Sequence, residues 1–117
     1  MAIKKITFNW PESVPLDQIN HQFIQGMLDR MAQGFHVYGH ALREDHKPDS
    51  IACLKLRIKK YRETHNTEFL IDAANYAMME FMKPKDSKAF FLPTTKRESP
   101  GAILQNKKRV KGKEDFE

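Results

Sequence analysis

Three polar residues, Glu68, Asp72 and Asn75, form a stripe on a segment, residues 67–82, that is otherwise apolar on nearly all sides. At about 100° per residue, positions i, i+4 and i+7 of a helix fall within an arc of roughly 60°. Burying a carboxylate costs several kcal/mol unless it is paired, hydrogen-bonded or bound to a metal. The stripe must therefore meet a metal ion, a basic neighbour or a ligand-filled cavity.

The two carboxylates of this stripe fit two chemistries. Glu68 and Asp72 lie one turn apart and could offer oxygen ligands to Mg²⁺, with water or phosphate completing the octahedron. The alternative is structural: Glu68 favours the positive end of the helix dipole in the first turn. Asp72 then pairs with Arg57 or Lys60 of the preceding helix. Asn75 in that case satisfies a backbone group, and the sequence leaves both alternatives open.

The elements that must position the stripe are three helices. Apolar residues recur every three or four positions over residues 15–33, which predicts a helix with Ser13 as its cap and Gly34 at its end. A second helix is expected over residues 51–64, capped by Ser50. Asn66 is expected to end it in a left-handed conformation, and Thr67 to cap the third helix, which ends before Pro84. The short connections between them predict an all-α fold, a small bundle of three main helices in antiparallel succession.

The segments outside these helices differ in composition. Residues 1–12 read as an extended N-terminal arm, and residues 13–101 as a single helical domain. Within that domain, residues 86–101 are expected to form a C-terminal strap, anchored on the helices by Phe90, Phe91 and Leu92. Residues 102–117 form a basic tail that we expect to be disordered.

Composition limits the class of protein. The single cysteine, Cys53, excludes an internal disulfide, and no run of about 18 apolar residues or signal-peptide pattern is present. These features predict a soluble protein of the cytoplasm with no membrane partner. The net charge of +5 favours a polyanionic partner. Basic residues concentrate in two groups: Lys55, Arg57, Lys59, Lys60 and Arg62 in the second helix, and Lys107, Lys108, Arg109, Lys111 and Lys113 in the tail.

A resemblance rests on two motifs. The run Glu68-Phe-Leu-Ile-Asp72-Ala-Ala-Asn75-Tyr76-Ala77-Met78 resembles the Asp-x-Ala-Asn-Tyr-Ala-type segment of the MazG-like all-α nucleotide pyrophosphohydrolases and of phage nucleotide-modification-associated helical domains. Phe35-His36-Val37-Tyr38-Gly39 is similar to the Lys-x-x-Asp-Tyr-Gly turn of the same superfamily. The resemblance covers about residues 27–82. The chain also looks like small proteins of phages and their bacterial hosts.

The resemblance implies roles for individual residues. Glu68 and Asp72 would hold Mg²⁺, and Asn75 would contact a base or sugar. Phosphates would be bound by Arg57 and Lys60. The resemblance also places His36 and Tyr38 at the nucleotide, because they lie in the matching turn.

The chain departs from the catalytic members of that superfamily in its second helix. The paired-acid motif Glu-Glu-x-x-Glu is missing, and Glu63 is the only acid there. A basic helix facing a polar stripe suits holding an anionic nucleotide better than cleaving one. The leading hypothesis is a phage-type nucleotide-binding protein that sequesters a nucleotide or nucleotide-derived signal of host defence. We expect a homodimer, because helices of this length cover the apolar third helix poorly.

Two rival hypotheses remain. One is a Mg²⁺-dependent nucleotide pyrophosphohydrolase, which would need further acids, such as Glu63, Glu80 or Glu98, to converge on Glu68 and Asp72. The other is a basic interaction protein that binds a host protein or nucleic acid through the second helix and the tail.

Overall fold

The computed structural model describes residues 2–105 and 109–110. The chain divides into two compact units, Met1–Lys85 and Asp86–Glu117. The first unit holds three α-helices, α1 (His21–Tyr38), α2 (Ser50–Thr64) and α3 (Glu68–Met82), and two 3₁₀ turns, η1 (Leu16–Gln18) and η2 (Glu44–His46). The predicted all-α fold with three main helices is confirmed.

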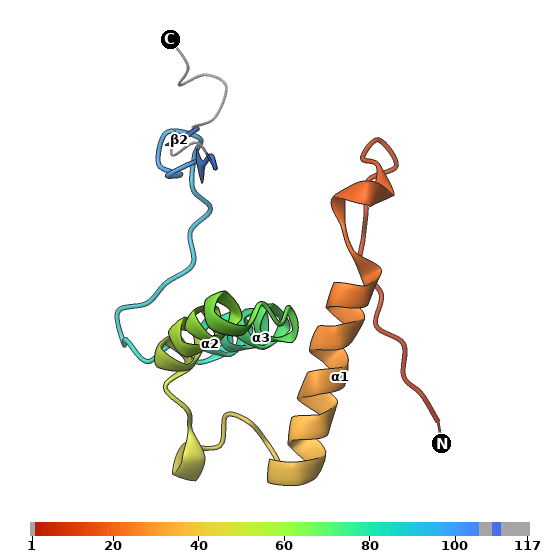
Figure 1. The fold of residues 1–117 in the computed structure, drawn as a ribbon, viewed down its shortest axis with the longest axis vertical. Coiled ribbons are helices and arrows are strands. Elements are labelled where there is room, and N and C mark those ends of the chain that lie inside the picture. Colours follow the sequence, from red (N-terminus) through yellow and green to blue (C-terminus); the bar gives the residue numbers. More distant parts are fainter. Residues whose placement is uncertain (1, 106–108, 111–117) are drawn as a thin grey trace. The chain divides into compact units, whose positions relative to one another are not determined.

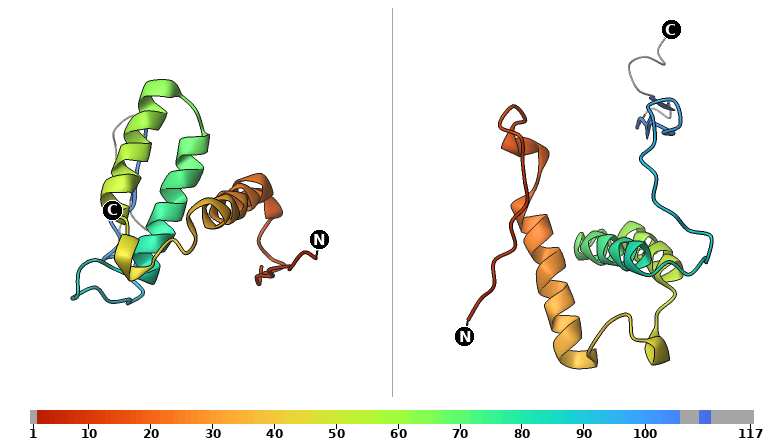
Figure 2. Two further views of the ribbon diagram at one scale, coloured as in Figure 1. Left: turned by 90° about the horizontal axis from the view of Figure 1, so that it is seen from below. Right: turned by 180° about the vertical axis from the view of Figure 1, so that it is seen from behind.

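Helices α2 and α3 form an antiparallel hairpin (Figures 1 and 2). The connection is short because His65 adopts a left-handed conformation, with φ of 63°, and its N–H donates to the carbonyl of Tyr61 at 2.7 Å. The predicted cap of α3, Thr67, stands at the N-cap position but makes no side-chain capping hydrogen bond. The side chain of Asn66 instead accepts from the N–H of Glu68 at 3.0 Å. The left-handed stop of α2 is therefore His65, one residue before the predicted stop at Asn66.

The two ends of this hairpin also meet. Asp49 caps α2 by accepting from the N–H of Ala52 at 3.1 Å, and its other carboxylate oxygen lies 3.2 Å from the Lys85 ammonium, just beyond α3. The predicted cap, Ser50, is instead the first residue of the helix and is buried. Asp49 is favoured at the cap position because its carboxylate also forms an ion pair with Lys85.

Helix α1 begins and ends later than the sequence pattern predicts. Pro15 leads into η1, and the cap of α1 is Asn20, whose side chain accepts from the N–H of Phe23 at 2.7 Å. At the other end Gly34 continues the helix, which stops at Gly39 with φ of 81°. A glycine ends a helix only where the backbone needs a positive φ, and that position is Gly39.

Helix α1 contacts α3 and, within the described part of the chain, no other helix. Gly26 makes the close approach, because a Cβ at this position would lie 2.7 Å from Cδ1 of Ile71. No residue of α1 is buried. The buried core of the described chain is small and consists of Ser50, Ala73, Asn75 and Met79.

The second unit contains a short antiparallel pair, β1 (Ala102–Ile103) and β2 (Arg109–Val110), with Ala102 opposite Val110. These strands lie in the stretch expected to be disordered, and residues 106–108 and 111–117 of that stretch lie outside the described residues. The predicted strap, residues 86–101, belongs to the second unit. The strap over the helices therefore stays a prediction.

Candidate functional site

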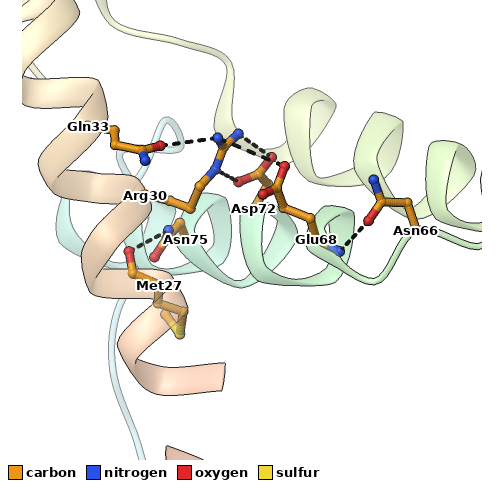
Figure 3. Close-up of polar contacts among 7 residues, drawn as sticks. All are labelled: Met27, Arg30, Gln33, Asn66, Glu68, Asp72 and Asn75. Carbon is orange, nitrogen blue, oxygen red and sulfur yellow. Dashed lines mark hydrogen bonds and ion pairs between the residues drawn. The ribbon is translucent and has the colours of Figure 1, made fainter. Parts of the chain in front are cut away.

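The acidic stripe of α3 meets a guanidinium from α1 (Figure 3). Arg30 Nε lies 3.0 Å from Asp72 Oδ1 and Arg30 Nη2 lies 3.1 Å from Asp72 Oδ2, which is a bidentate pair. Arg30 Nη1 is also 3.9 Å from Glu68 Oε1. The hydrogen bond to Asp72 raises the pKa of Arg30 above its usual value. Of the three environments that the sequence left open for the stripe, the structure places it beside a basic neighbour.

Asn75, the third member of the stripe, also joins α3 to α1. Its side chain is 2% exposed, and Nδ2 donates to the backbone carbonyl of Met27 at 3.0 Å (Figure 3). The prediction that Asn75 satisfies a backbone group is confirmed. Its Oδ1 is buried without a hydrogen-bond partner in the described chain. Because burying an unpaired acceptor is unfavourable, this amide limits the stability of the contact between α1 and α3.

An open cavity of about 1140 Å³ lies beside this contact. It is bounded by the C-terminal half of α1, by residues 39–48, and by the facing sides of α2 and α3. Its volume lies just above the range for small-molecule sites, about 300–1,000 Å³. The chemically active lining residues are Arg30, Tyr38, His40, Arg43, His46, Arg57, Asp72, Asn75, Tyr76 and Lys83.

The charge of this lining is strongly unbalanced. Four lining residues are Arg or Lys, whereas Asp72 is the one acid that lines the cavity in the described chain. The charge of Asp72 is already matched by Arg30. Arg43 and Lys83 pair with Asp45 and Glu44, which lie outside the lining. Among the described residues, Arg57 therefore supplies the positive charge that suits the cavity to an anionic ligand.

Arg57 is the most available of these cations. Its guanidinium carbon lies 4.8 Å from the ring centroid of Tyr76, and no carboxylate of the described residues lies within 4.0 Å of it. Burial raises the pKa of the Tyr76 phenol, while the Arg57 charge lowers it. The ring therefore stays neutral at pH 7 and supports the guanidinium through a cation–π contact.

Two further cations fix the connection between α1 and α2. Lys83 donates from its ammonium to the carbonyl of Leu42 at 3.3 Å and to Glu44 at 3.1 Å, and this contact lowers the pKa of Glu44. Arg43 pairs with Asp45 at 3.1 Å and donates to the carbonyl of Tyr38. Exposed ion pairs contribute about 0–1 kcal/mol, so a ligand phosphate can replace these carboxylates at little cost.

The structure brings together four of the residues predicted for the site and leaves out three. Tyr38, Arg57, Asp72 and Asn75 line the cavity, whereas His36, Lys60 and Glu68 are not among its lining. Lys60 pairs with Glu63 at 3.7 Å on α2. The expected partner of Asp72 on α2 is also corrected, because the pairing cation is Arg30.

The two carboxylates, as arranged, fit a guanidinium better than a metal ion. Both oxygens of Asp72 are bound by Arg30, and Mg²⁺ would have to displace that side chain. Within residues 2–105 and 109–110, no group of three or more His, Cys, Asp or Glu side chains is arranged to hold a metal. Binding of Mg²⁺ by Glu68 and Asp72 stays a prediction.

Arg30 is the functional residue that the sequence reasoning missed. A signal was available, because Arg30 is the only Lys or Arg in α1, just as Glu68 and Asp72 are lone acids on the first turns of α3. A lone cation on one apolar helix and lone acids on another predict a pair between them. No such pattern in the sequence predicts the contacts of Arg43 and Lys83 with the connection between α1 and α2.

Comparison with protein-family models, with curated proteins and with solved structures gives no match. In the described part of the chain, none of the helices has both the length and the apolar character needed to span a bilayer. The class of the protein defined by the structure is that of a small all-α protein with a cationic cavity beside its helical hairpin.

Proposed function

We propose that this chain binds a nucleotide-type organic phosphate in the cavity between α1, residues 39–48 and the α2–α3 hairpin. The observation that carries the proposal is Arg57, a cation that lines the cavity, is supported by Tyr76 and has no carboxylate partner among the described residues. A guanidinium in this setting binds phosphate oxygens through paired, charge-assisted hydrogen bonds.

The rest of the cavity supports the same ligand class. Phe35 and Tyr38 lie in the lining and are 51% and 71% exposed, so their rings are available to a planar base. Stacking of a base on an aromatic side chain contributes about 1–3 kcal/mol. The lining therefore offers aromatic rings that could hold a base and the Arg57 guanidinium that could hold a phosphate.

Binding is favoured over cleavage in this proposal. The carboxylates available for metal-assisted hydrolysis are Glu68 and Asp72, and their charge is matched by Arg30. On this basis the chain holds a nucleotide or nucleotide-derived signal, as the sequence predicts for a phage-type protein directed at host defence.

The experiment is a depletion assay with the purified full chain. Nucleoside triphosphates, cyclic nucleotides and cyclic oligonucleotides are incubated with it and Mg²⁺, the protein is filtered off, and the filtrate is resolved by anion exchange. A nucleotide that disappears and returns intact on denaturation supports the proposal. A new monophosphate peak establishes the pyrophosphohydrolase instead.

An Arg57→Gln variant tests the assignment of the site. Loss of one charge-assisted contact should weaken binding of the depleted nucleotide by about 10- to 100-fold. Arg62→Gln is the matched control, since Arg62 lies on the same helix but does not line the cavity. Equal affinity for both variants, in folded protein, would contradict the site.

A macromolecular partner is favoured by a different observation. Lys55, Lys59 and Arg62 are exposed and follow one another at i, i+4 and i+7 on α2, so they form a single basic stripe. If no nucleotide of the panel is depleted, this stripe becomes the first surface to test with DNA and RNA. Such binding would weaken steeply with salt.

A further inference from the structure

The arm and α1 enclose a second groove, separate from the cationic cavity. It has a volume of about 500 Å³ and lies between residues 6–10, η1 and the first half of α1. Its apolar lining includes Ile6, Phe8, Trp10, Leu16, Ile24 and Leu28. The Trp10 indole N–H donates to the carbonyl of Val14 at 2.8 Å, which fixes this ring at the groove.

The groove lies on the side of α1 that faces away from α3. At 100° per residue, Ile24 and Leu28 lie roughly 160° around the helix axis from Gly26 and Arg30. Gly26 and Arg30 make the contact with α3. Helix α1 is therefore apolar on two opposite faces, and α3 covers only one of them. Helices in proteins gain most of their stability by packing an apolar face against another element. The face of α1 that carries Ile24 and Leu28 would therefore be stabilised by a partner.

We infer that the partner is a second copy of this chain, which packs its own arm and the outer face of α1 into this groove. Isologous contact is favoured because the same surface offers both the hollow and protruding side chains beside it. Phe8 is 80% exposed and Leu16 is 64% exposed at the edge of the groove. A two-fold axis places these side chains of each copy in the hollow of the other.

The exposed apolar area at the groove reaches the size of the smallest specific interfaces. Ile6, Trp10 and Leu28 are 62%, 39% and 36% exposed in the single chain, in addition to Phe8 and Leu16. With about 200 Å² for a large apolar side chain, these five residues expose on the order of 550 Å² per copy. A symmetric pair that buried all of this area would bury about 1,100 Å², just above the threshold of about 1,000 Å² for a specific interface and below the range of about 1,200–2,000 Å² for standard stable ones.

Charge favours this face over the others. The chain has a net charge of +5, so two copies repel each other over most of their surface. None of the residues that line the groove is Lys, Arg, Asp or Glu. Lys4, Lys5 and Glu12 lie on the arm but outside the lining, so the hollow itself brings no like charges together.

The test is the mass of the full chain by light scattering and sedimentation over roughly a hundredfold range of concentration. We expect a dimer of the 13.7 kDa chain. Leu28→Glu should raise the dissociation constant about a hundredfold or more, because each copy would bury an unpaired carboxylate. Leu56→Glu is the control, since Leu56 has similar exposure but lies on α2.

A second variant keeps the test valid if Leu28→Glu fails to fold. Leu16 lies in η1, outside the three helices, so Leu16→Glu should preserve the helical circular dichroism and still dissociate the dimer. A wild-type chain that is monomeric throughout the range overturns the inference. So does a folded Leu16→Glu variant that dimerises as tightly as wild type. Neither result depends on whether the cavity binds a nucleotide.

Discussion

The pair of Arg30 with Asp72 can be measured by a double-mutant cycle. Arg30→Met keeps the aliphatic stem and removes the charge, and Asp72→Ala removes the acceptor. The side chains are 40% and 13% exposed, so the pair lies between a surface pair and a buried one. Surface pairs contribute about 0.2–1 kcal/mol, and hydrogen bonds to charged groups about 1.5–3 kcal/mol. After allowance for solvent screening of the half-exposed Arg30, we expect a coupling energy of about 1–2 kcal/mol.

The assay is urea unfolding of the four proteins of the cycle, followed by far-ultraviolet circular dichroism at pH 7. Lys60 and Glu63 supply the matched control cycle, because both side chains are 50% exposed and their charged atoms lie 3.7 Å apart on one helix. Such i,i+3 pairs contribute about 0.2–0.5 kcal/mol. If the two cycles give equal coupling energies, the contact between α1 and α3 is not held by this ion pair.

Two further predictions concern the glycines of α1 and the cap of α2. Gly34→Ala should raise the free energy of unfolding by about 0.5–1 kcal/mol, because the space that its new Cβ would occupy has no other atom within 4 Å. Gly26→Ala reduces backbone entropy in the same way, but its new Cβ must displace Ile71 Cδ1. Its free energy of unfolding should therefore be about 1 kcal/mol lower than that of Gly34→Ala. Equal free energies of unfolding for the two variants would contradict the close approach of α1 to α3. The pKa of Asp49 is lowered by its backbone hydrogen bond to the helix and by Lys85, so this carboxylate stabilises the fold above its unfolded pKa of about 3.9 and loses that effect as the pH falls. The free energy of unfolding, measured by urea denaturation at several pH values, should therefore fall less for Asp49→Ala than for wild type between about pH 5 and pH 2. An equal fall for the two proteins would contradict the role of Asp49.

The helices could be predicted from the sequence because their determinants are local. Apolar spacing defines all three, and Pro84 ends the third wherever the rest of the chain lies. The ends of α1 could not be placed in the same way. Gly34 and Gly39 are both possible stops in sequence. The structure uses Gly39, which has a φ of 81° and whose N–H donates to the carbonyl of Phe35 at 2.8 Å.

The site could be predicted only in part. The burial of Asn75 and its bond to a backbone group follow from its place on an apolar helix. The partner of Asp72 does not, because Arg30 lies 42 residues earlier in the chain and reaches Asp72 through the crossing of α1 over α3. A crossing angle is set by side-chain packing between helices. The sequence shows a glycine at position 26, but not that this glycine faces Ile71 of α3.

The ion pair between Asp49 and Lys85 joins the two ends of the α2–α3 hairpin. Since these residues lie just before α2 and just after α3, the polypeptide enters and leaves the hairpin at one place. A segment with adjacent ends can be grafted into a surface loop of a host protein without distorting that loop. The α2–α3 hairpin therefore has the geometry of a transplantable module, to which α1 and its arm are joined as a separate addition.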